Sequence, residues 1–283
     1  MTVSKINTPF VFCDARRKIC AFFCLLLVLF LFCGCEVTVS GTRTEESLPD
    51  DETTTAEDLL VNATPQKRVA LTYDDGPHNV RTPLIVDELN KYGFHATFFV
   101  VGNRVDGVDY SGGKALQYAV AAGNEIAIHG YTHTVYYDEC SAGEFHQELA
   151  LTKQAIYEAS PATPVKLMRP IGGAITRERA NQCPYSVILW SVDSLDWKYQ
   201  YSAGDSDEVC AEKVNTIVNN VLESVEDGDI ILMHDIYEST YDATVILLAR
   251  LKEMGYEVVT VSELLGADLR PGEIYSRVVE AKG

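Results

Sequence analysis

From residue 67 onward, short apolar runs alternate with longer amphipathic stretches, and this alternation is the strongest constraint on the fold. The runs have the length and composition of buried strands. They are residues 69–73, 96–101, 125–128, 165–168, 186–192, 229–233 and 257–260. Strands that are apolar on both faces are typical of a parallel sheet covered by helices. The sequence therefore predicts an α/β fold with a parallel sheet over roughly 200 residues.

The stretches between the runs place apolar residues at helical spacing. They are residues 82–92, 113–122, 142–159, 208–222 and 243–254. Ser141 precedes the third of them, and Glu144 follows three residues later, which is the pattern of a capping box. We expect a helix in each stretch.

The N-terminus has the pattern of an export signal. Arg16, Arg17 and Lys18 precede an uninterrupted apolar run, residues 19–33, which ends at Gly34 and Cys35. The Gly-Cys pair resembles the lipobox of bacterial lipoproteins, so we expect residues 1–35 to direct export and Cys35 to carry the lipid. An uncleaved membrane anchor and ordinary cleavage are the two alternatives, and the run is short for a transmembrane helix of about 20 residues.

The next segment, residues 36–66, is polar, Thr-rich and acidic, and we predict a flexible linker. It would lead into a catalytic domain at 67–266, followed by a short C-terminal extension at 267–283. The net charge of the whole chain is −18, which argues against a nucleic-acid partner because it repels phosphates. We expect an exported monomer on the extracellular face of the cell membrane.

Five of the eight cysteines lie in the first 35 residues. The remaining three, Cys140, Cys183 and Cys210, are widely spaced and give no disulfide framework. One disulfide among them is compatible with the sequence, which does not select the pair.

Polar side chains follow five of the predicted strands, at the point where each strand ends. They are Asp74 and Asp75, His129 to His133, Arg169, Asp196 with Trp197, and His234. In barrels of parallel strands, catalytic residues gather at the carboxyl ends of the strands. We therefore expect these residues to converge on one site.

The residue types in this set suit hydrolysis assisted by a metal. Two imidazoles and one carboxylate, with an open position, form a catalytic site for a divalent cation, commonly zinc. Asp74 and Asp75 should diverge because side chains alternate along a strand, so one could bind metal while the other accepts a proton. Taken singly, each feature also fits a structural role: a turn after a strand, an unliganded histidine pair or a surface arginine.

Five motifs occur together in one order, and with them the sequence resembles the polysaccharide deacetylases of the NodB-homology group, carbohydrate esterase family 4. The resemblance extends from about residue 69 to residue 265. The motifs are Thr72-Tyr73-Asp74-Asp75-Gly76-Pro77, His129-Gly130-Tyr131-Thr132-His133, Arg169-Pro170, Asp193-Ser194-Leu195-Asp196-Trp197 and Leu232-Met233-His234. The resemblance implies an incomplete or distorted (β/α) barrel.

The resemblance also implies a role for each residue of the motifs. Asp74 would be the general base, His234 the general acid, Arg169 the residue that orients the base, and Asp196 the residue that tunes the acid. The metal ligands would be Asp75, His129 and His133, with zinc expected and cobalt or manganese as alternatives. Trp197 and Leu232 would form the pocket for the acetyl methyl group.

One motif departs from the family pattern. The family usually has a proline and an aromatic residue after Arg-Pro, whereas this chain has Ile171, Gly172 and Gly173. The backbone N–H of the aromatic position normally helps to stabilise the oxyanion. Gly172 retains that N–H but supplies no side-chain wall, so the resemblance implies a more open subsite.

The function expected from these residues is metal-dependent removal of N-acetyl groups from N-acetylglucosamine in an extracellular polysaccharide. Peptidoglycan is the substrate that we expect first. The nearer alternative is an O-acetyl esterase acting on xylan or a similar polymer. The farther alternative is a glycan-binding lipoprotein without catalytic activity.

Overall fold

The computed structural model describes residues 66–107 and 111–278. The predicted export signal, Cys35 and almost all of the predicted linker lie outside these residues. Within the described part of the chain, no helix is both long and apolar enough to cross a membrane. The predicted catalytic domain, 67–266, falls in one compact unit.

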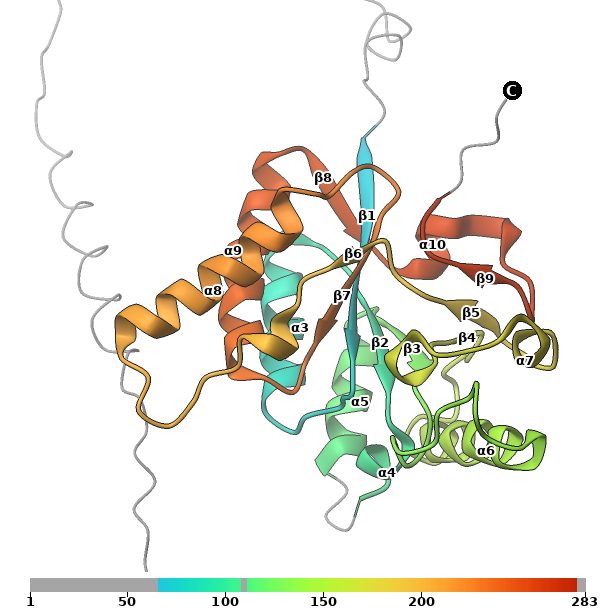
Figure 1. Cartoon of the computed structure of the whole chain (residues 1–283). Helices are drawn as coiled ribbons and strands as arrows, with labels where there is room; N and C mark the ends of the chain where they lie inside the picture. The colour runs from blue at the N-terminus through green and yellow to red at the C-terminus, as the bar shows by residue number, and fades with distance from the viewer. Residues whose placement is uncertain (1–65, 108–110, 279–283) are drawn as a thin grey trace, which may run out of the picture. The chain divides into compact units, whose positions relative to one another are not determined.

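The unit is built on a single sheet whose ladders are all parallel. Its strands are β1 (Lys67–Asp74), β2 (Thr97–Val100), β3 (Glu125–Ile128), β4 (Leu167–Met168), β5 (Ser186–Ile188), β6 (Val192–Asp193), β7 (Ile230–His234), β8 (Tyr256–Val259) and β9 (Ile274–Tyr275). The strand order is β6-β7-β1-β2-β3-β4-β5-β9, and β8 pairs with the first half of β1. The α/β class and parallel sheet expected from the sequence are confirmed (Figure 1).

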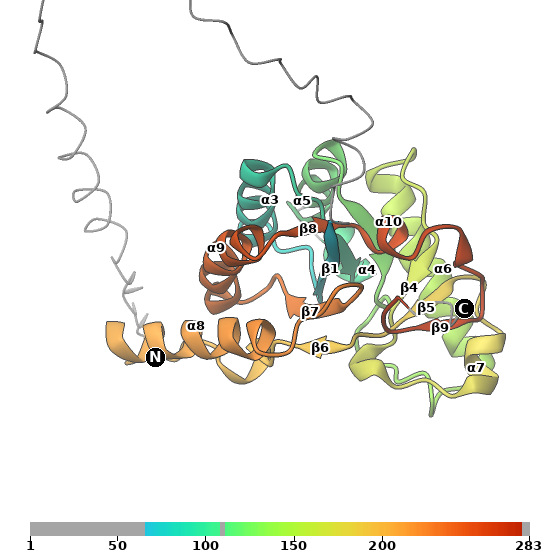
Figure 2. The same ribbon diagram turned by 90° about the horizontal axis from the view of Figure 1, so that it is seen from above.

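The prediction of a single strand at residues 186–192 is wrong, because the segment forms two strands, β5 and β6, with different neighbours. The Leu189 N–H donates to the Tyr275 carbonyl of β9, whereas the Ser191 N–H donates to the Ile230 carbonyl of β7. Within three residues the chain therefore passes from β5, which lies next to β9 at one end of the strand order, to β6 at the other end. This change of neighbour curves the sheet into an incomplete barrel, as the resemblance implied (Figure 2).

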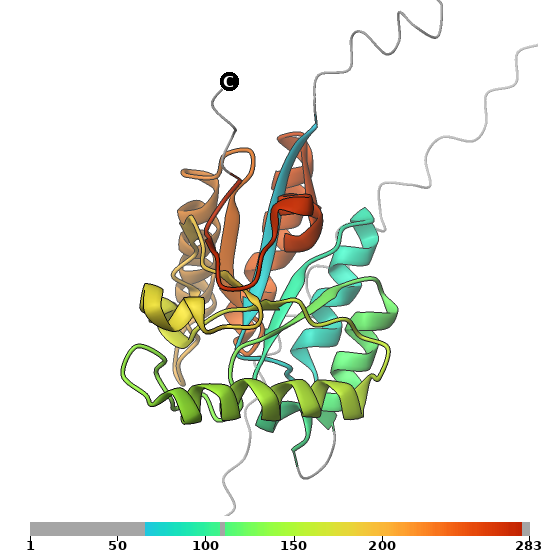
Figure 3. The same cartoon turned by 90° about the vertical axis from the view of Figure 1, so that its right-hand side faces the viewer.

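Helices cover the outside of the curved sheet, except that the last of them packs Val261 against the inner side (Figures 2 and 3). They are α3 (Arg81–Tyr92), α4 (Gly102–Val105), α5 (Ser111–Ala121), α6 (Ala142–Ala159), α7 (Arg177–Asn181), α8 (Asp207–Leu222), α9 (Glu238–Glu253) and α10 (Val261–Leu265), with 3₁₀ turns η2 (Ile171–Gly173), η3 (Asp196–Lys198) and η4 (Gly266–Asp268). The predicted capping box at Ser141 and Glu144 opens α6. Helix α9 begins five residues before the predicted start. Its first turn buries Ser239 and Thr240, and because both are polar this turn lacks the apolar pattern on which the prediction was based.

Alternation along each strand separates two apolar cores. The larger core includes Leu71 and Tyr73 of β1 and lies between the sheet and the helices. A smaller cluster takes one residue from each of several strands and packs on the inner side of the barrel. Its members are Ala70, Phe99, Ala127, Leu167, Ile188, Ile230 and Val261.

The sheet continues past residue 266, where the sequence analysis ended the catalytic domain. Strand β9 pairs with β5, and the Val278 N–H donates to the Gly228 carbonyl. Residues 267–278 therefore complete one edge of the barrel instead of forming a separate extension.

Candidate active site

The site grows out of the inner core, because each inward-facing row of side chains ends in a polar residue. Stepping by two from Ala70 leads through Thr72 to Asp74, and stepping by two from Ile230 leads through Leu232 to His234. In the same way Ala127 leads to His129 and Leu167 leads to Arg169. The strand period and the parallel register bring these four polar groups to one rim, as the sequence predicted.

Three of the predicted residues form a compact candidate metal site. Ligand atoms of Asp75, His129 and His133 all lie within 4.8 Å of one another. The Asp75 Oδ1 atom is 2.7 Å from His133 Nε2 and 3.3 Å from His129 Nε2. Burial alone would raise the pKa of Asp75, but the two imidazoles hold that pKa well below its usual range.

The donor set fits a divalent cation. Within the described residues the buried Asp75 Oδ1 atom makes no hydrogen bond of good geometry, despite the two imidazole nitrogens close to it. His129 Nδ1 lies 2.9 Å from the Arg169 carbonyl and donates its proton there, so Nε2 is the ring nitrogen that faces Asp75 and would bind the ion. Two imidazole nitrogens and one carboxylate oxygen aimed at a common point suit zinc or cobalt.

Asp74 and Asp75 share His129 as a neighbour and each has one partner of its own. Strand alternation, which we expected to separate them, is not the cause. Asp75 follows the end of β1 and adopts a left-handed conformation, with φ of 71°. Both carboxylates consequently approach His129, whose Nε2 atom is 3.7 Å from Asp74 Oδ2. The two carboxylates differ in their other partner, because Asp74 accepts a hydrogen bond from Arg169 and Asp75 lies against His133.

Arg169 is fully buried and binds the Asp74 carboxylate by a hydrogen-bonded ion pair. Its Nη1 atom donates to Asp74 Oδ1 at 2.7 Å and to Thr72 Oγ1 at 2.8 Å. The remaining nitrogens donate to the carbonyls of Ile188 and Leu189, so the contact with Asp74 uses one nitrogen and is not bidentate. The planar guanidinium also stacks 4.1 Å from the Phe99 ring centroid. Asp74 is therefore fixed in one orientation.

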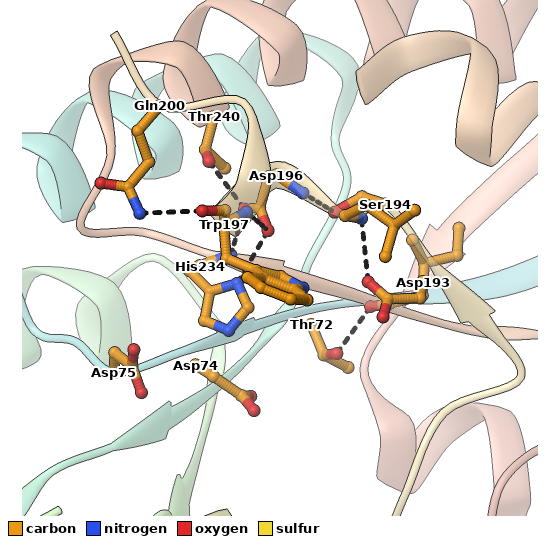
Figure 4. Close-up of polar contacts among 12 residues, drawn as sticks. Thr72, Asp74, Asp75, Asp193, Ser194, Asp196, Trp197, Gln200, His234 and Thr240 are labelled. Carbon is orange, nitrogen blue, oxygen red and sulfur yellow. Dashed lines mark hydrogen bonds and ion pairs between the residues drawn. The ribbon is translucent and has the colours of Figure 1, made fainter. Parts of the chain in front are cut away.

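His234 ends β7, next to Asp74 of β1, and is held by Asp196 (Figure 4). Asp196 Oδ1 is 2.7 Å from His234 Nδ1, and Oδ2 accepts from the His234 backbone N–H and from Thr240 Oγ1. Burial alone would lower the pKa of His234, but the hydrogen bond and charge of Asp196, with smaller effects of Asp74 and Asp75, raise it to about 9. The imidazole is thus protonated at neutral pH.

The three residues expected around the acetyl group differ in exposure. Leu232 is buried and lies two positions before His234 on β7. Trp197 follows Asp196 in η3, and 45% of its surface is exposed. Gly172 has φ of 61° within η2, and a Cβ atom there would lie 3.7 Å from the Tyr136 ring, so nothing but an exposed side chain borders it.

Two residues that support the site were not singled out by the sequence analysis. Thr72 lies inside the first motif, and its hydroxyl links Arg169 to the Ile231 carbonyl. Thr240 lies in the first turn of α9 and donates to Asp196, but no local pattern in the sequence marks it. The three cysteines of the described residues form no disulfide.

An anchored carboxylate and an anchored imidazolium next to a candidate metal site, at the carboxyl ends of barrel strands, define a class of hydrolytic site. Comparison with known proteins narrows this class. The family model described as polysaccharide deacetylase matches residues 61–188. The chain belongs to the polysaccharide deacetylase family.

Two relatives carry names that refer to peptidoglycan. The peptidoglycan-N-acetylglucosamine deacetylase PgdA of Listeria monocytogenes is 34% identical over 209 residues, which are 74% of this chain and 41% of that protein. The peptidoglycan-N-acetylmuramic acid deacetylase PdaC of Bacillus subtilis is 36% identical over 218 residues, which are 77% of this chain and 41% of that protein. The match thus spans less than half the length of both relatives.

A similar solved structure is the family 4 acetyl xylan esterase of Clostridium thermocellum in complex with a cobalt ion. It superposes with a TM-score of 0.65 and is 30% identical, and the match covers 75% of this chain and 99% of that chain. The agreement extends over almost the whole of that structure and confirms the fold.

Proposed function

We propose that this protein is a metal-dependent hydrolase that removes N-acetyl groups from N-acetylglucosamine residues of peptidoglycan. The observation that carries the proposal is the grouping of these residues at one rim: the Asp75, His129 and His133 cluster lies next to Asp74, whose strand pairs in register with that of His234. A base and an acid at one reaction centre are what amide hydrolysis needs, because water loses a proton while the amine gains one.

The proposed metal ion is one divalent cation per chain, zinc before cobalt or manganese, held by Asp75, His129 and His133. When bound, such an ion polarises the amide carbonyl and makes water more acidic. The relative solved with a cobalt ion supports a divalent cation in this family without deciding which ion this chain takes.

The chain's own residues would perform the proton transfers. Asp74, oriented by Arg169, accepts the proton of the attacking water. His234 is protonated at neutral pH and lies beside Asp74 at the same rim, so it donates a proton to the departing amine nitrogen. Gly172 offers its backbone N–H to the oxyanion, and Leu232 and Trp197 border the acetyl methyl group.

The choice of substrate rests on the relatives. PgdA and PdaC are both named for peptidoglycan, and they differ in which sugar is deacetylated. We propose N-acetylglucosamine, in agreement with the expectation from the sequence. The esterase likeness makes an O-acetylated polymer such as xylan the alternative to test.

The proposed place of action is the outer face of the cell membrane. The basic residues and apolar run before Cys35, followed by the acidic segment 36–66, support export, lipid attachment at Cys35 and a tether to the catalytic domain. We propose that the protein acts there as a monomer.

A side-by-side assay of acetate release tests the function. The zinc-loaded full chain is compared on peptidoglycan, chitooligosaccharides and acetylated xylan, with Asp74→Asn as the control. The proposal requires the highest kcat/KM on peptidoglycan and release by the control that is slower by about 10²–10⁴-fold. Higher kcat/KM on acetylated xylan would establish the esterase, and no release from any of the three substrates would refute the proposal.

A further inference from the structure

We infer that Glu148 is a positioning residue for the candidate metal site, acting through the loop that carries His133. Glu148 lies in the middle of α6, far in sequence from the strand ends, and only 6% of its surface is exposed. It touches none of the three proposed ligands by any hydrogen bond among the described residues. The inference rests on the metal site of the proposed function.

The Glu148 carboxylate binds the backbone between the two histidines. Its Oε2 atom accepts from the Tyr131 N–H at 2.6 Å and from the Thr132 N–H at 2.9 Å. Its Oε1 atom accepts from Thr132 Oγ1 at 3.0 Å. Both oxygens accept, which is how a carboxylate stabilises consecutive backbone donors that no strand or helix satisfies.

The other side of the same loop is held by α4. The N–H groups of Gly102 and Asn103 donate to the carbonyls of Gly130 and Tyr131. Glu148 takes the N–H groups and α4 takes the carbonyls, so the peptide groups between His129 and His133 are held from two directions. Removing Glu148 leaves two backbone donors of this loop without their partner.

Gly130 is required between the histidines by its conformation and by the Tyr137 hydroxyl. Its φ is 91°, and a Cβ atom there would lie 2.9 Å from that hydroxyl. Glu148 Oε2 would lie 3.4 Å from the same Cβ atom, an ordinary contact, so the carboxylate packs against the loop without itself excluding a side chain.

The two histidines depend on Glu148 to different degrees. His129 is held independently, because its backbone N–H donates to the Val100 carbonyl and its ring to the Arg169 carbonyl. His133 has φ of 59°, a left-handed conformation that is unfavourable for a residue with a side chain. Such a conformation persists only where the surroundings impose it, and the bonds of Glu148 to the residue just before His133 do so.

The test measures metal affinity with Zn²⁺ alone, using a competing chromophoric chelator and the purified full chain. Glu148→Ala should raise the Kd for Zn²⁺ by about 10–100-fold, the usual cost of losing a residue that orients a ligand. Glu148→Gln should bind close to the wild type, because its carbonyl can accept both N–H groups and its NH₂ group can donate to Thr132. Glu148→Asp, which draws the carboxylate back by one methylene, should weaken binding.

Glu125 supplies a matched control. It is a half-buried glutamate that, like Glu148, accepts three hydrogen bonds, from Thr97 and from the backbone and hydroxyl of Ser262. It begins β3, whereas His129 follows the other end of that strand. Glu125→Ala should lower stability in urea without changing the Kd for Zn²⁺ or the visible spectrum of the Co²⁺-loaded protein, which Glu148→Ala should change.

The outcomes separate the inference from the proposed function. Wild-type affinity and an unchanged Co²⁺ spectrum in both Glu148→Ala and Glu148→Asp would overturn the inference alone. An equal loss of affinity in Glu125→Ala would also overturn it, since the effect would then be general destabilisation. Failure of the wild-type protein to bind Zn²⁺ would overturn both; if Glu148→Ala does not fold, the Asp and Gln variants decide.

Discussion

Asp196→Asn should move the alkaline limit of activity to lower pH. The variant keeps an oxygen that can accept from His234 Nδ1 but loses the negative charge. Asp196 is the main reason that the pKa of His234 stands near 9 instead of its ordinary value of 6.5, because burial acts in the opposite direction. That difference corresponds to about 3 kcal/mol in favour of the imidazolium.

The size of the effect follows from the fraction of protonated His234. At pH 8, a group with a pKa of about 9 is about 90% protonated, whereas one at 6.5 is about 3% protonated. If His234 donates the proton to the amine, kcat at pH 8 should fall by about 30-fold in the variant. Below pH 6 the two proteins should approach each other in rate.

The assay is the pH dependence of kcat, with the wild type and the variant at the same metal loading so that the difference isolates Asp196. An NMR titration of the His234 imidazole in both proteins supplies the pKa directly. Stability should follow the same group: a raised folded-state pKa stabilises the fold below pH 6.5, and this contribution disappears as the pH rises through about 9. An unchanged alkaline limit and an unchanged His234 pKa in Asp196→Asn would refute the reasoning.

Four other substitutions test the proposed roles, the lipid anchor and the packing. Asp74→Asn should keep bound zinc while kcat falls by about 10²–10⁴-fold, whereas Asp75→Asn should lose zinc and recover part of its activity when zinc is added. Metal content and rate, measured on the same samples, check both expectations, and a fully active Asp74→Asn would exclude Asp74 as the general base. Cys35→Ala should abolish lipid labelling and leave a precursor or a released protein, and unchanged labelling and size would point to an uncleaved anchor. Gly76→Ala should lower the free energy of unfolding by about 1–3 kcal/mol, because the new Cβ would overlap both carboxylate oxygens of Asp235; wild-type stability in urea would contradict the packing described.

Much of the fold was predictable because strand and helix periods are local properties of the sequence. Residues 125–128 and 142–159 form β3 and α6 with the predicted bounds, and the capping box at Ser141 is present. The division of 186–192 into β5 and β6 was not predictable, since it depends on which neighbours the chain meets, β9 or β7. Strand β9 was missed for a similar reason, because two residues form no recognisable run.

The candidate site was predictable in its members and less so in its supports. Polar residues at strand ends are visible in the sequence, and parallel register brings Asp74 beside His234. Glu148 and Thr240 escaped notice because they act from helices whose rotation about the strands no local pattern specifies. The conformation of Asp75 was also hidden, since its φ of 71° arises from the turn after β1.

The most direct test of the central claim is mass spectrometry of purified peptidoglycan after treatment with the protein. Zinc-loaded full chain and the same protein stripped by a chelator are compared, and tandem spectra of the muropeptides locate any acetyl group that has been lost. The account predicts acetyl loss on N-acetylglucosamine with the zinc-loaded protein, and none with the stripped protein until zinc is restored. Intact N-acetylglucosamine under both conditions, or equal acetyl loss with and without metal, would contradict it.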